Sequence, residues 1–127
     1  MFGILKLVSP FKDWYNVQIT NSELGQLSYP MGISGEIIAG LILIICLLYK
    51  QKMTVRLYYL LTNTSFVMIV IMMSTAIYVH LNPNVPADVL PLKIKQPFIP
   101  IFLLLIALLN ILLSLKQIAG QKEKQKA

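Results

Sequence analysis

The sequence has little charge, one cysteine and one histidine, and each shortage excludes a class of function. Charged residues make up 13% of the 127 residues, against about 25% in soluble domains, which disfavours a water-soluble globular protein. Cys46 can form neither an intrachain disulfide nor a CxxC redox pair. His80 alone cannot supply two axial ligands to a haem or three histidines to a metal, so neither site is expected in this chain.

Motifs that carry chemistry are also lacking. The sequence contains no P-loop, no dinucleotide-binding fingerprint and no set of residues that would activate a nucleophile. We therefore expect that the chain is not an enzyme by itself, and that a partner or a bound cofactor carries any reaction.

Long apolar runs dominate what is present. The segments 31–49, 57–79 and 97–115 are each close to the 20 or so apolar residues that cross a hydrocarbon core of about 30 Å. They predict an all-α, polytopic membrane helix bundle that forms a single membrane domain over residues 1–127. We expect an irregular, proline-rich external loop over 80–96 and a frayed basic tail over 116–127. Residues 1–30 are too short in apolar length to span, and they resemble an interfacial stretch.

Basic residues are distributed unequally between the two ends of the predicted spans. One side holds seven of them (Lys50, Lys52, Arg56, Lys116, Lys122, Lys124 and Lys126), and the other holds four (Lys6, Lys12, Lys93 and Lys95) together with Asp13, Glu23 and Asp88. The positive-inside rule places the 50–56 loop and the C-terminus in the cytoplasm. Because the cations lie at span ends rather than among exposed aromatic residues, the net charge of +6 indicates a lipid bilayer and not nucleic acid.

Glu36 is the one charged residue inside the first apolar run. A carboxylate at membrane depth costs roughly 2.5–3.5 kcal/mol on insertion scales, so it usually has a partner or a function. Gly32 and Gly40 lie on the same helical stripe, and Gly35 with Ala39 forms a small-xxx-small pair beside it. Small residues allow another helix to approach closely, so the carboxyl is predicted to face protein rather than lipid.

The partners available to Glu36 lie at the outer end of the bundle. Lys6, His80, Lys93 and Lys95 are all predicted on that side, and with Glu36 they form the candidate ligand-binding or functional polar cluster. The alternative is that Glu36 is a structural carboxyl, protonated or paired across a helix interface. No catalytic and no metal-binding residues are assigned.

A second polar pair lies nearer the basic side. Asn63 and Asn110 are each about six residues from the basic end of their spans, so we predict that they lie at similar depth in adjacent helices and form a hydrogen bond. This pair is interpreted as a helix-packing contact.

Three stretches resemble the DoxX family of small bacterial membrane proteins. They are residues 3–7 (GILKL), residues 32–41 (GISGEIIAGL) and the run from Tyr78 to Pro83. Members of that family have four helices, with a G-x-x-K-L stretch at the outer end of the first and an acidic residue in the second. This sequence begins at the G-x-x-K-L stretch, so the resemblance implies that most of the first helix is missing. Glu36 and Lys6 match the family's positions.

The resemblance also implies a class of function. The family takes its name from a terminal quinol oxidase subunit, and relatives are membrane partners of redox enzymes or, further away, assembly or trafficking factors. We therefore expect a multi-pass protein of the bacterial inner membrane that serves as an accessory subunit of an oxidoreductase and holds a hydrophobic ligand such as a quinone. The alternatives are an assembly or scaffolding factor and a small-solute or proton pathway. The last is disfavoured because no second charge lies within a span. The expected partners are the lipid bilayer and either oxidoreductase subunits or further copies of the chain.

Overall fold

The computed structural model describes residues 2–126, and every regular element within that range is helical. Two short helices come first, α1 (Phe2–Leu5) and α2 (Phe11–Asn21). Three long helices follow, α3 (Ser28–Tyr49), α4 (Val55–Leu81) and α5 (Phe98–Lys126). Short 3-10 turns lie in the connections: η1 (Lys50–Lys52), η2 (Ala87–Val89) and η3 (Pro91–Lys93). The predicted all-α class is confirmed.

The three long helices are the three predicted spans. Each is long and apolar enough to cross a membrane, which supports a membrane-embedded protein. The predicted bounds of the first two are right to within three residues at each end. The third is longer than predicted, because α5 continues through the basic tail to Lys126. The prediction of a frayed tail is wrong for that stretch, since lysine, glutamine, glutamate and alanine are good helix formers and only Ile118 and Gly120 interrupt them.

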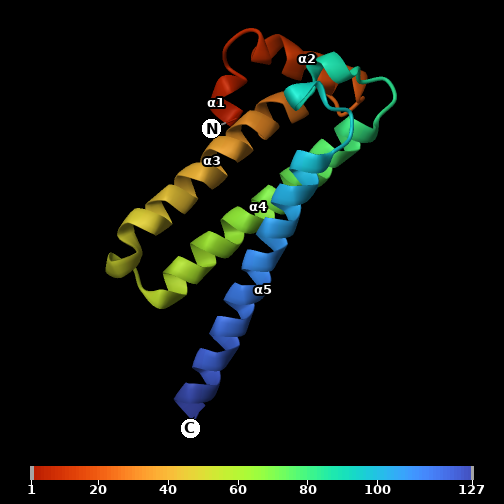
Figure 1. Ribbon diagram of the computed structural model, residues 1–127. Helices are drawn as coiled ribbons and strands as arrows, with labels where there is room; N and C mark the ends of the chain where they lie inside the picture. Colours follow the sequence, from red (N-terminus) through yellow and green to blue (C-terminus); the bar gives the residue numbers. More distant parts are fainter. Residues whose placement is uncertain (1, 127) are drawn as a thin grey trace.

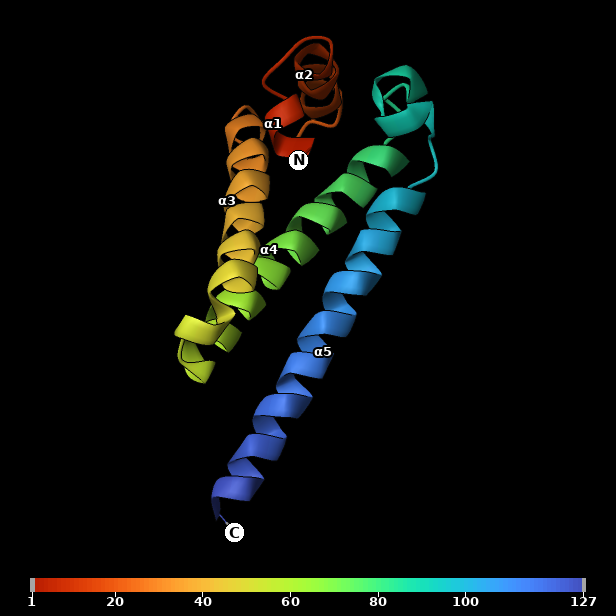
Figure 2. The ribbon, with the colours of Figure 1, turned by 60° about the vertical axis from the view of Figure 1, so that its left-hand side comes forward.

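α4 lies between α3 and α5 and packs against both (Figures 1 and 2). On the α3 side, the Met72 side chain of α4 packs against Gly35, because a Cβ built there would lie 3.0 Å from Met72 Sδ. Ala39, one turn further along α3, is almost fully buried. The predicted small-residue contact at Gly35 and Ala39 is therefore confirmed, and its partner is α4.

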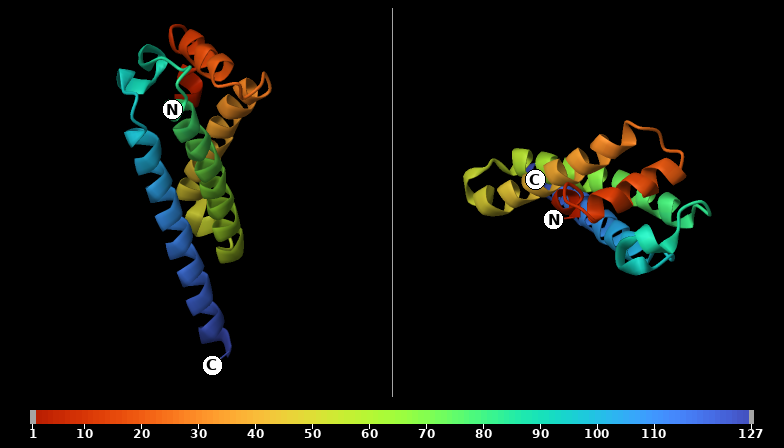
Figure 3. Two further views of the ribbon diagram at one scale, coloured as in Figure 1. Left: turned by 90° about the vertical axis from the view of Figure 1, so that its right-hand side faces the viewer. Right: turned by 90° about the horizontal axis from the view of Figure 1, so that it is seen from above.

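The N-terminal segment and the 82–97 connection together cover one end of the bundle. α2 lies across this end, beside η2 (Figure 3). One small core joins α2 to α3 through Tyr15, Ile19 and Ile33. A second core joins the end of α4 to the connection through Val79, Val85 and Leu90. Gln18 donates a hydrogen bond from its side chain to the backbone carbonyl of Val89, which links the two. We call this the capped end, and the end with η1 and the C-terminus the basic end.

Candidate functional site

α1 and α2 position two side chains over Glu36. α1 packs directly on α3, where a Cβ on Gly3 would lie 3.0 Å from Glu36 Cβ and 3.2 Å from the Ile33 carbonyl oxygen. A larger residue at position 3 would hold the helices apart, so glycine allows the chain to bring Lys6 to the level of Glu36. Tyr15 reaches the same place from α2.

Lys6 and Glu36 form an ion pair. Lys6 Nζ donates to Glu36 Oε1 at 2.5 Å, and the two side chains are 21% and 20% exposed. The ammonium group also lies 4.1 Å from the centre of the Tyr15 ring, so it is held by a carboxylate and an aromatic face together. Of the partners predicted for Glu36, the structure selects Lys6. Glu36 faces protein, as predicted from the small residues around it.

Tyr15 also belongs to this site, although the sequence analysis did not predict it as a site residue. Its hydroxyl donates to the Ser28 carbonyl oxygen at 3.4 Å, and it occupies the space beside Gly32, where a Cβ would overlap Tyr15 Oη. Burial is the main cause that raises the pKa of Tyr15 to about 12, and the negative charge of Glu36 adds to it. The signal in the sequence was Gly32 one turn from Glu36, which predicted a close neighbour but not which one.

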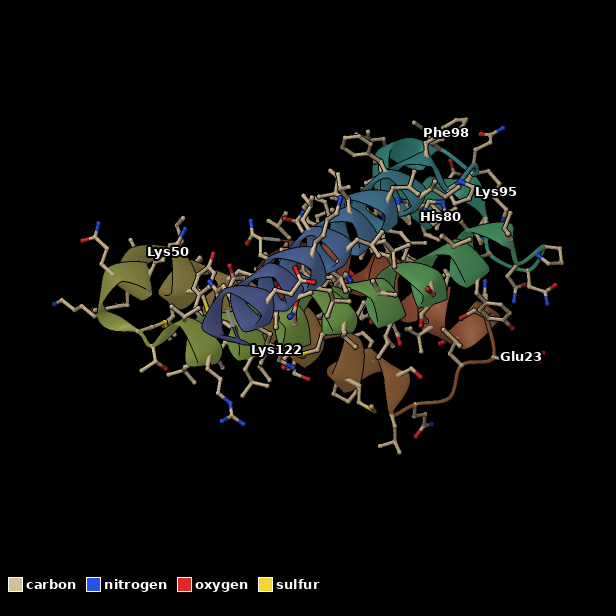
Figure 4. All side chains as sticks on the ribbon, turned by 90° about the horizontal axis from the view of Figure 1, so that it is seen from below. Glu23, Lys50, His80, Lys95, Phe98 and Lys122 are labelled. Carbon is tan, nitrogen blue, oxygen red and sulfur yellow. The ribbon has the colours of Figure 1, made fainter. Side chains whose placement is uncertain are left out.

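His80 and Lys95 form a separate contact at the capped end (Figure 4). His80 is 4% exposed, and its Nδ1 lies 3.3 Å from the backbone carbonyl oxygen of Lys95. Lys95 Nζ turns back and donates to the carbonyl oxygens of Asn82 and Val85. These bonds close the connection onto the end of α4, so both residues hold the loop in place.

The five residues predicted as one polar cluster therefore separate into two pairs and a free side chain. No hydrogen bond or ion pair within residues 3–123 joins Lys6 and Glu36 to His80 and Lys95. Lys93 is exposed, and its backbone adopts a left-handed conformation with φ 56°, as does that of Leu92 with φ 57°. Such angles turn the chain sharply, which directs Lys93 away from the helices while Lys95 folds back.

The predicted hydrogen bond between Asn63 and Asn110 does not form. Asn110 Nδ2 donates to the Ile106 carbonyl oxygen of its own helix at 2.8 Å, and Asn63 Oδ1 is enclosed without a partner. The register explains this, because Tyr59 Oη donates to Gln117 Oε1 at 2.7 Å. In an antiparallel pair this places Asn63 level with residue 113, so Asn110 lies three residues, or ~4.5 Å, away along the axis. The estimate of similar depth was too coarse to place two amides within bonding distance.

The outer polar residues do not form an open ligand site around Glu36. Its carboxylate is engaged by Lys6, and neither of the two best-formed grooves on the described chain is lined by Glu36, Lys6 or His80. One of these grooves lies between α4 and the end of α5, and the other lies beside α2. Glu36 and Lys6, the two residues that match the family's positions, are therefore paired with each other and line neither of these grooves.

Comparison of the chain with family models, with curated proteins and with solved structures gives no match in any of the three. The DoxX resemblance and the four-helix architecture that it implies therefore stay predictions. The geometry alone defines the class: a helical, membrane-embedded protein whose N-terminal segment is fastened to its first long helix by an ion pair.

Proposed function

We propose that the protein is a non-catalytic accessory subunit of a membrane assembly, and that it holds a transmembrane helix of a partner against α3. The observation that carries this proposal is the open face of α3 directly beyond α1. Glu36 and Lys6 contribute by fixing α1, and so they define where that face begins.

The open face of α3 continues the helical stripe against which α1 packs. α1 contacts α3 at Ile33, Glu36 and Ile37, and positions 40, 44 and 47 continue the same helical stripe. Gly40 has nothing within 4 Å of where its Cβ would be. Ile44 and Leu47 are 54% and 77% exposed. A glycine on an apolar stripe offers little to lipid but lets a second helix approach at backbone distance, which favours a helix as the occupant.

The class of partner comes from the resemblance. DoxX-like proteins are membrane partners of redox enzymes, so we propose a membrane oxidoreductase subunit as the source of the helix. The protein would then sit in the bacterial inner membrane with the basic end in the cytoplasm, in agreement with the positive-inside rule. The closed ion pair at Glu36 favours packing over a held quinone, and it equally suits an assembly factor.

Site-specific photo-crosslinking tests the proposal. A photoreactive phenylalanine at Leu47, which is 77% exposed, is compared in the membranes of the producing cells with one at Leu105, which is 59% exposed on α5. We expect a discrete adduct from Leu47 that Gly40→Leu abolishes. Gly120→Leu is the matched control, because that glycine also has no atom within 4 Å of its would-be Cβ.

The pattern of adducts decides between the alternatives. Equal labelling from Leu47 and Leu105, or no protein adduct from Leu47, would refute the helix-packing role. An adduct with a second copy of the 14.4 kDa chain would show that the packed helix comes from a homo-oligomer and not from an oxidoreductase subunit. An adduct whose mass spectrum identifies an oxidoreductase subunit would support the proposal in full.

A further inference from the structure

A groove at the basic end of the molecule has no part in the packing of α3. It lies between α4 and the last turns of α5 and has a volume of about 1010 Å³. α4 contributes Arg56, Tyr59 and Asn63, and α5 contributes Gln121 and Lys122 among its polar lining. Thr64 completes the polar lining, and the rest is apolar: Val55 and Ile118 near the basic end, and Leu60, Val67 and Met68 further along α4.

Along the helix axis the lining changes from charged at the mouth to apolar further in, which is the order of polarity in an amphiphile. Arg56 and Lys122 are exposed cations from two different helices at the mouth of the groove. Val67 lies 11 residues beyond Arg56 on α4, about 16 Å deeper. Charge therefore gives way to apolar surface over about half of a bilayer's hydrocarbon thickness. An occupant that matches both parts has an anionic head and an acyl chain.

The side chains between these two regions are polar. Tyr59 donates a hydrogen bond to Gln117 of α5 and so holds the two helices together below the two cations. Asn63 makes no side-chain hydrogen bond with the described residues, and only its Oδ1 is enclosed, which leaves Nδ2 accessible to the groove. An amide N–H at this depth can donate to an ester carbonyl, the acceptor that a glycerolipid carries between its phosphate and its chains.

The charge at this end favours an anionic lipid over a zwitterionic one. Lys50, Lys52 and Lys116 are further exposed cations near the basic ends of the long helices, and Glu123 is the carboxylate next to Lys122 in the sequence. Figure 4, viewed from this end, shows Lys50 and Lys122 on separate helices. Each cation near an anionic membrane surface contributes about 1 kcal/mol, and arginine can bind phosphate with two parallel hydrogen bonds.

We propose that this groove binds one anionic phospholipid from the leaflet at the basic end. The phosphate lies between Arg56 and Lys122, the ester region lies against Asn63, and an acyl chain follows Leu60, Val67 and Met68. The site is independent of the partner helix on α3, because the two surfaces share no residue.

Native mass spectrometry with added lipids tests this. The full chain in detergent is titrated with phosphatidylglycerol or phosphatidylcholine of the same acyl composition. We expect one phosphatidylglycerol to bind at least ~10-fold more tightly than phosphatidylcholine. Arg56→Gln with Lys122→Gln is expected to remove that preference. Lys50→Gln with Lys116→Gln removes the same charge outside the groove and is expected to lower the affinity clearly less than the groove pair does.

Three results would overturn the proposal. Equal loss in both double variants would show diffuse attraction without a site. Equal binding of the two lipids would show that the head group is not recognised. Competition by inorganic phosphate at concentrations that match the lipid would show an anion site that does not use the chain. Asn63→Leu adds an independent measurement, because it removes the ester contact while leaving the charge and the surface cations unchanged.

Discussion

Replacing Glu36 by glutamine tests whether the ion pair fastens the N-terminal segment to α3. The substitution keeps the size and a hydrogen-bond acceptor but leaves Lys6 as a partly buried cation without a counter-charge. At 2.5 Å two unit charges attract by about 6.6 kcal/mol at an effective dielectric of 20, and desolvation of both groups opposes most of this. Broken buried pairs cost about 3–5 kcal/mol and exposed pairs about 0–1. With both side chains one-fifth exposed, we expect a loss of about 2 kcal/mol.

The chain contains its own probe for this measurement. Trp14 is the single tryptophan and lies in α2, in edge-to-face contact with Phe11. Its fluorescence during reversible unfolding in mixed micelles reports directly on the segment that the ion pair holds. Asp88→Asn is the matched control, because Asp88 is an exposed carboxylate at the same end of the molecule, and it is expected to change stability by less than about 0.5 kcal/mol.

A double-mutant cycle with Lys6→Met isolates the interaction itself. If the two side chains form an ion pair, the double variant is expected to recover at least about 1 kcal/mol relative to the sum of the single losses. A silent Glu36→Gln would refute the reasoning, because glutamine can replace a neutral carboxylic acid but not a paired carboxylate. If the stability losses of the two single variants simply add in the double variant, the reasoning is also refuted, because the two side chains then do not interact.

Three further outcomes follow from the same geometry. Because burial raises the pKa of Tyr15 to about 12 while an unfolded tyrosine titrates near 10, stability is expected to fall as pH rises from about 10 to 12. In a spectrophotometric titration, Tyr15→Phe is expected to remove the absorbance change of one tyrosine near pH 12. Gly32→Ala is expected to cost about 1–3 kcal/mol, because its Cβ overlaps Tyr15 Oη, whereas Gly40→Ala, which meets nothing, should be neutral or stabilising in thermal unfolding. In a Cys46→Ser background, cysteines at Gln51 and Gln121 should resist impermeant reagents in intact cells, and external labelling of both would contradict the proposed orientation.

The spans could be predicted from the sequence because length and hydropathy act locally. Each run of apolar residues must satisfy its own backbone hydrogen bonds in a bilayer, so helix is the outcome wherever 20 such residues occur. Contacts made by small residues were also predictable, since Gly35 and Ala39 permit an approach that larger side chains forbid. The sequence did not show that the surface at Gly32 is covered by Tyr15 from a short helix rather than by another span, because that depends on how α2 lies across the bundle.

Polar pairs were harder to predict because depth alone does not decide which side chains meet. His80, Lys93 and Lys95 share the outer end with Glu36, yet two positive-φ residues turn the connection so that Lys95 binds carbonyls near Asn82 instead. Irregular backbone of this kind leaves no periodic signal in a sequence. Lys6 was one of the partners predicted for Glu36, and only a short helix had to pack beside α3 to bring it there.

The polar residues of α4 and α5 show how a membrane helix can satisfy its side chains without a partner. The hydroxyls of Thr62 and Ser65 are buried, and both donate to carbonyl oxygens one turn back in α4, at 2.8 and 3.1 Å. Two buried atoms lack such a solution: Asn63 Oδ1, which accepts, and Ser114 Oγ, which can donate. The register set by Tyr59 and Gln117 places them at neighbouring levels on facing helices. The hydrogen bond that the structure shows between side chains of α4 and α5 is therefore the one from Tyr59 to Gln117, and Asn110 is satisfied inside its own helix.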